Sequence, residues 1–179
     1  MNILTGLAAV SQIIKECITS ENTPEGMLND VLSVITVVNN EEGIDEPAIW
    51  INEHPTIPYD NAKTKLSRDI DLATTFEFVC IEYDPDPETA ELKGKNLASR
   101  ACLAVMKNFQ HIQKKYGMRV IKNIHFVAFY PVGEISIKGK REKVPATSIV
   151  LSVVHNIDWL NCCKRKNNDN NDNNDNDGD

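Results

Sequence analysis

A long strand signal that runs directly into a long helix signal constrains this chain more than any other feature. Within the stretch Arg68–Phe109, the apolar residues first alternate between two faces, with Phe76 and Phe78 on one and Val79 and Ile81 on the other. Alternation of β-branched and aromatic residues predicts a strand. Because both faces are apolar near its end, we expect this strand to be central in its sheet.

The start of the following helix is marked by three consecutive residues. Asp86 is a natural N-cap, Pro87 suits the first helical position, and Glu88 favours the positive end of the helix dipole. An apolar stripe at helical spacing then follows, formed by Ala90, Leu97, Ala101, Ala104, Val105 and Phe109. A strand that leads directly into an amphipathic helix predicts a sheet with a helix packed on it.

The length of 179 residues predicts one domain. We expect a single α+β domain over residues 1–163 and a disordered tail over residues 164–179, because Asn167–Asp179 contains only Asn, Asp and one Gly. Asn167–Asp179 holds five Asp of the net charge of −7, which leaves −2 for residues 1–166. A nearly neutral body gives no electrostatic case for nucleic acid or anionic membrane as the main partner.

Targeting and redox signals point to a reduced, intracellular protein. No apolar run is long enough for a membrane span, and the N-terminal apolar segment is interrupted by Gln12, Lys15 and Glu16, so export is not expected. The five cysteines are an odd number, and three of them fall within helix or strand patterns as small apolar residues.

The other segments before the central strand are shorter. Apolar residues at helical spacing predict a first helix over Ile3–Ile18. Met27–Val38 fits a strand or one to two helical turns, and its β-branched content favours the strand. Pro47–Asn52 is a short apolar strand, and the proline-containing stretch after it is a loop or an edge.

The chain after the long helix predicts a hairpin. Gly117 is a natural helix C-cap, and Val120–Tyr130 and Ser148–Trp159 have strand patterns. On the first of these strands, Phe126 and Phe129 are expected on opposite faces. The predicted fold class is therefore α+β, a mostly antiparallel four- to five-stranded sheet flanked by two main α-helices, with an extended β-hairpin.

Motifs for catalysis and for metal or cofactor binding are missing. The chain has no CxxC, HExxH, GxSxG, GxGxxG or GxxxxGK[ST], and its histidines are scattered over a loop, a helix and two strands. The Asn/Asp tail ends before the closing Glu of a calcium loop. We expect neither an enzyme nor a metal, cofactor or small-molecule site.

The segment between the two hairpin strands carries a dense group of basic residues, Lys138, Lys140, Arg141 and Lys143. This group is either a solvated loop or a docking arm for an acidic protein surface or, less readily, for nucleic-acid phosphates. Aromatic residues for base stacking are missing from it, which disfavours single-strand recognition.

The order of these elements resembles that of tail terminator (tail completion) proteins of long-tailed bacteriophages and phage-tail-like particles. The resemblance covers most of residues 1–160. It depends on the first helix, on PAIWINE, on FEFVCIEYD with the helix AELKGKNLASRACLAVMKNF, and on IHFVAFYPVGE and SIVLSVVHNIDW. The long Glu21–Glu46 region and the Asn/Asp tail depart from the family pattern.

The resemblance implies a structural virion protein of the tail or neck, assembled in the host cytoplasm. Such a protein forms a hexameric ring that caps the tail tube, ends its polymerisation and joins the tail to the head connector. Its implied partners are further copies of itself, the tail tube protein, the connector and, in contractile tails, the sheath. By the same analogy, the Val132–Ala146 hairpin and the Asn39–Lys65 loops are interface candidates.

Two tryptophans are candidate anchors for such contacts. Trp50 adjoins the proline-containing loop and Trp159 precedes the tail, and each either completes the core of the subunit or binds a neighbouring one. The alternative functions are another neck or connector protein, or a small enzyme or nucleic-acid-binding module that uses the basic hairpin.

Overall fold

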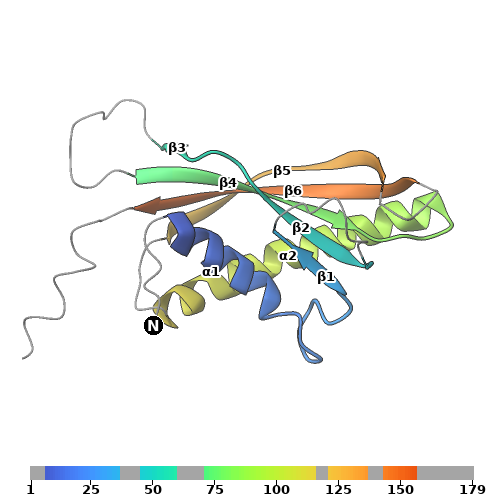
Figure 1. Cartoon of the computed structure of the whole chain (residues 1–179), viewed down its shortest axis with the longest axis horizontal. Coiled ribbons are helices and arrows are strands. Elements are labelled where there is room, and N and C mark those ends of the chain that lie inside the picture. Colours follow the sequence, from blue (N-terminus) through green and yellow to red (C-terminus); the bar gives the residue numbers. More distant parts are fainter. Residues whose placement is uncertain (1–6, 37–44, 60–70, 116–120, 137–142, 157–179) are drawn as a thin grey trace, which may run out of the picture.

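The computed structural model describes residues 7–36, 45–59, 71–115, 121–136 and 143–156. These residues form two helices and one mostly antiparallel sheet, which confirms the predicted α+β class. Both helices lie on the same face of the sheet (Figure 1). The sheet has six strands, where four to five were expected.

The sheet is built around one long antiparallel pair. The strand order is β1-β2-β4-β6-β5, and β3 also pairs with β4. All pairs are antiparallel except β1 with β2. The strands are β1 Ser33–Ile35, β2 Ala48–Glu53, β3 Ile57–Pro58, β4 Asp71–Ile81, β5 Ile121–Ser136 and β6 Lys143–Asn156.

Strand β4 is central and apolar on both faces, as predicted. Phe76 and Phe78 are buried under the helices in the main core. Val79 and Ile81 are buried on the opposite face, in a smaller cluster that includes Ala146. We call this the uncovered face because neither of the two described helices lies on it (Figure 1). Because both faces of β4 are apolar near its end, the apolar pattern there does not by itself distinguish the observed register with β6 from a one-residue slip.

Helix α2 (Pro87–Lys115) begins where the sequence predicts. The Asp86 carboxylate accepts a hydrogen bond from the Thr89 backbone N–H at 3.0 Å, so Asp86 is the N-cap. The buried face of the helix contains the small residues Gly94, Ala98 and Ala101. A Cβ at Gly94 would lie 2.9 Å from the Thr147 hydroxyl, so this glycine permits α2 to approach β6 closely.

Helix α1 (Leu7–Thr19) packs against α2, and polar contacts hold the following segment to the same helix. The nearly buried Glu21 carboxylate accepts hydrogen bonds from Asn108 at 2.7 Å and from Lys107 at 2.9 Å. Arg100 forms a bidentate pair with Asp30 at 2.6 and 2.9 Å. These contacts attach the connection between α1 and β1 to one flank of α2.

Two sequence predictions need correction. In its described part, the Met27–Val38 segment is a strand only over Ser33–Ile35, and turns precede this strand. In β5, a bulge between Phe126 and Ala128 shifts the alternation, so that Phe126 and Phe129 pair with Leu151 and Ile149 and share one face. They had been expected on opposite faces. Gly117 lies outside the described residues.

We expect Gly94→Leu to destabilise the fold by about 1–3 kcal/mol, because the new side chain would overlap the buried Thr147. Urea unfolding measures this change in the free energy of unfolding. Asn96→Leu, on the exposed face of the same helix, is the matched control and should be neutral or slightly stabilising. Equal effects of the two substitutions would contradict the close approach of α2 to β6.

Candidate functional site

The uncovered face of the sheet carries a polar cluster around Glu77 of β4. Its carboxylate accepts hydrogen bonds from the hydroxyls of Tyr130 at 2.5 Å and Ser148 at 2.6 Å, and from Asn52 at 3.2 Å and His54 at 3.4 Å. Tyr130 comes from β5, Ser148 from β6 and Asn52 from β2, and His54 follows β2. One carboxylate thus links four strands.

The donors set the protonation of this cluster. Burial alone would raise the pKa of Glu77, but the hydrogen bonds from Ser148, Tyr130, Asn52 and His54 together outweigh it and hold the pKa below its usual value. The hydrogen bond to Glu77 raises the pKa of Tyr130. A carboxylate with four donors and a tyrosine that keeps its proton are poor catalysts of proton transfer. The cluster instead links neighbouring strands by side-chain hydrogen bonds.

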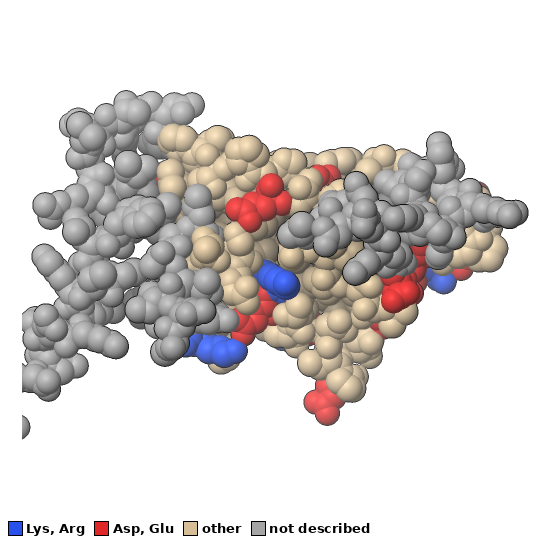
Figure 2. All heavy atoms as spheres, viewed as in Figure 1, with Lys and Arg blue, Asp and Glu red and all other residues tan. Residues whose placement is uncertain are grey.

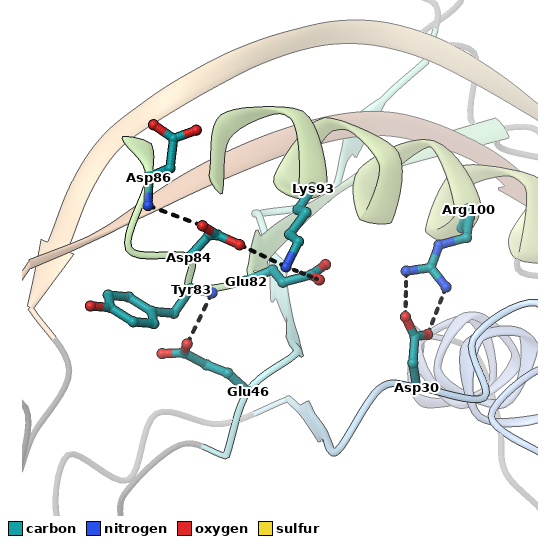
Figure 3. A network of polar contacts seen from close by, with 8 residues as sticks. All are labelled: Asp30, Glu46, Glu82, Tyr83, Asp84, Asp86, Lys93 and Arg100. Carbon is teal, nitrogen blue, oxygen red and sulfur yellow. Dashed lines mark hydrogen bonds and ion pairs between the residues drawn. The ribbon is translucent and has the colours of Figure 1, made fainter. Parts of the chain in front are cut away.

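A second polar cluster lies where β4 leads into α2 (Figure 3). Asp84 accepts a hydrogen bond from the Asp86 backbone N–H at 3.0 Å and pairs with Lys93 at 2.9 Å, and both contacts lower its pKa. Lys93 also lies 4.0 Å from Glu82, whose pKa is raised by burial. The acidic turn therefore caps the helix, as the sequence indicates.

The described cysteines and histidines do not form a shared site. Burial raises the pKa of the Cys17 thiol to about 12 and also raises the pKa of Cys80 and Cys102, so these thiols stay protonated. His155 is buried, and its Nε2 forms a hydrogen bond with the Thr74 hydroxyl at 2.8 Å. Burial lowers the pKa of His155. Across the described ranges, no group of three or more His, Cys, Asp or Glu is arranged to hold a metal ion.

The structure describes two of the six predicted partner-binding residues, Trp50 and Lys143. Trp50 is half-buried in β2, where it packs on the small cluster of the uncovered face. Lys143 is the first residue of β6. The predicted contact residues Lys138, Lys140, Arg141 and Trp159 lie outside the described residues, as do residues 39–44 and 60–65 of the Asn39–Lys65 region.

Sequence reasoning missed two features. The first is the Glu77 cluster, for which the signal was a charged residue inside an otherwise apolar central strand. The second is a set of exposed apolar side chains on α2 and β5, chiefly Leu103, Met106, Phe126 and Phe129. The helical signal for Leu103 and Met106 was their position outside the core-facing stripe of α2.

Charged side chains are not gathered into one field on the face shown in Figure 2, where they lie in small separate groups. Among the helices that the structure describes, neither is long and apolar enough to cross a membrane. No protein-family model matches the chain, and no match was found among curated proteins.

We expect Glu77→Gln to lower the free energy of unfolding by about 1–3 kcal/mol at neutral pH, because charge-assisted hydrogen bonds are replaced by neutral ones. The effect should depend on pH. The folded-state pKa of Glu77 is lowered from 4.5, so its contribution is complete above that pH and is lost as the pH falls through the folded pKa.

Urea unfolding of the wild type and of Glu77→Gln between neutral pH and pH 3 measures this difference. The comparison cancels the contribution of His155, whose lowered pKa also costs stability in acid. Glu25→Gln, at an exposed position, is the control. A constant gap between wild type and Glu77→Gln down to the lowest pH would contradict the assignment.

Proposed function

We propose that this chain is a structural virion protein of the tail terminator type. In this proposal, copies of the chain form a hexameric ring that caps the tail tube, stops its polymerisation and joins the tail to the head connector. The ring would belong to the tail or neck of the particle and assemble in the host cytoplasm. The proposal assigns the chain no catalytic step and no cofactor.

The observation that carries the proposal is the arrangement of the elements. The resemblance in sequence order implies an α+β fold with a sheet flanked by helices, and the described residues have that fold, with α1 and α2 on one face and a long β5–β6 pair at the edge. A shared fold class admits many functions, so the resemblance in element order supplies the specific part of the argument.

The polar clusters of the described residues are consistent with a structural protein. Each has a role within the subunit: Glu77 links four strands, Asp86 caps α2, and Glu21 and Arg100 attach the α1–β1 connection. None of these groups presents an activated nucleophile or base, so we place the function on outer surfaces.

Co-expression with the tube protein of the same particle tests the capping activity. We expect tubes of uniform length with a ring at one end in negative-stain images, and tubes of unlimited length without this chain. Light scattering of the purified protein should give the mass of six copies of the 20.1 kDa chain. A strict monomer that never associates with tube ends would refute the proposal.

The basic segment provides a second prediction. Replacing Lys138, Lys140, Arg141 and Lys143 with Ser should abolish binding to tube ends without changing the unfolding midpoint, if this segment is the docking arm. A control with the same net charge carries Ser at four other basic positions, Lys15, Lys95, Lys114 and Lys122. The readout is co-sedimentation with preformed tubes.

The same variants separate the proposal from the nucleic-acid alternative. Salt-sensitive binding of duplex DNA that is lost in the Lys138, Lys140, Arg141 and Lys143 variant, together with unchanged tube binding, would favour a nucleic-acid-binding module instead. Retained tube binding in that variant would remove the basic segment from the interface.

A further inference from the structure

Two neighbouring elements expose large apolar side chains on one side of the molecule. On α2, Leu103 is 58% exposed and Met106 46%. On β5, Phe126 is 59% exposed and Phe129 37%. We call these four residues the α2–β5 surface.

The register of α2 on the sheet places these residues at the same level. Gly94 faces Thr147, and from there Leu103 is nine residues, about 14 Å, along the helix. Leu151 is four residues, about 13 Å, along β6 in the same direction, and its partner on β5 is Phe126. Hydrogen bonds between Gln113 and the backbone of Ile121 at 3.0 and 3.3 Å fix the far end of the same register.

The side chains of β5 also face the correct way. Phe126 and Phe129 pair with Leu151 and Ile149, which are buried in the main core on the helix-covered face. Strand β5 is the last strand of the sheet, so its two phenylalanines extend this face beyond the helices. Cys102 and Phe109 of α2, both half-buried, pack against the same core. The apolar face is therefore continuous from α2 to β5.

This surface carries no charge. Between Lys122 and Glu134, β5 contains no Lys, Arg, Asp or Glu, and α2 has Ser99, Cys102, Leu103, Met106, Phe109 and Gln110 on this side. Lys107, one turn after Leu103, is paired with Glu21. Edge strands are usually protected by charges. In β5, three bulges and Pro131 interrupt the row of backbone N–H and C=O groups at the edge of the sheet. An approaching molecule would therefore contact the side chains of β5.

The size of the surface suits the centre of a protein interface. Four side chains of this kind, each about half exposed, present roughly 300–400 Å² of apolar area. A standard interface buries about 800 Å² on each partner, with the apolar part at its centre. The four residues supply about half of that area.

We propose that the α2–β5 surface binds a second copy of this chain. An uncharged surface gains nothing from a charged partner, whereas permanent contacts between identical subunits are the most apolar protein interfaces. The inference rests on the proposed ring and names its contact. In a ring the interface is heterologous, so this surface meets a different surface of the next copy.

The test is the molar mass of the double variant Leu103→Glu with Phe126→Glu, measured by light scattering during gel filtration and by sedimentation velocity. Each substitution places a charge where burial would be costly, so the oligomer should dissociate to the 20.1 kDa monomer. Because both side chains are mostly exposed in the subunit, the circular dichroism spectrum and the unfolding midpoint should change little.

Leu32→Glu is the matched control, since Leu32 is 66% exposed and lies before β1, at the other edge of the sheet. It should retain the wild-type mass. A second double variant, Leu103→Ser with Phe126→Ser, avoids new charges and should weaken association at least tenfold. Dissociation of the Leu103→Glu with Phe126→Glu variant, but not of the Leu103→Ser with Phe126→Ser variant, would overturn the assignment, because the added charge alone would then explain the loss.

The outcomes also separate this inference from the proposed function. A wild-type oligomer that persists in both double variants overturns the α2–β5 contact and leaves tail capping intact. An oligomer that needs this surface but never binds tube ends supports the contact and refutes tail capping. A wild-type protein that stays monomeric at high micromolar concentration overturns the contact.

Discussion

The pairing of β4 with β6 is the constraint on which the rest of this structure depends. The two strands pair from Asp71 with Asn156 to Ile81 with Ala146, and near Ile81 apolar side chains are buried on both faces. Helix α2 packs on this pair, and α1 packs on α2. Strand β2 extends the sheet on one side and β5 on the other. Each outer element is thus placed by the central pair, either directly or, for α1 and β1, through α2 and β2.

The two faces of the sheet bury different kinds of side chain. The helix-covered face is filled with large apolar residues such as Phe76, Phe78 and Leu151. The uncovered face combines a small apolar cluster with the Glu77 cluster, whose donors come from neighbouring strands. Because these polar groups are already bonded to one another, the centre of the sheet offers little to a ligand. Interaction surfaces are expected at its margins, as on α2 and β5.

Local signals in the sequence predicted local structure well. Alternation identified β4, and the Asp86–Pro87 pair located the start of α2, because strand alternation and capping depend on neighbouring residues. The bulge at Val127 could not be predicted in this way, since it depends on how β5 aligns with β6. The Glu77 cluster needs the register of four strands. For the same reason, the apolar flank of α2 became visible only when its core-facing side was known.

The position of Glu77 has a consequence for how the chain reaches this register. The one-residue slip of β6 along β4 that brings Ile149 into the place of Ser148 would move Ser148 to the helix-covered face. The carboxylate, only 12% exposed, would lose a donor while it stayed away from water. Misaligned sheets of similar hydrophobicity would therefore be penalised at this one residue. Glu77 therefore favours the observed alignment of β4 with β6, which is a role in folding.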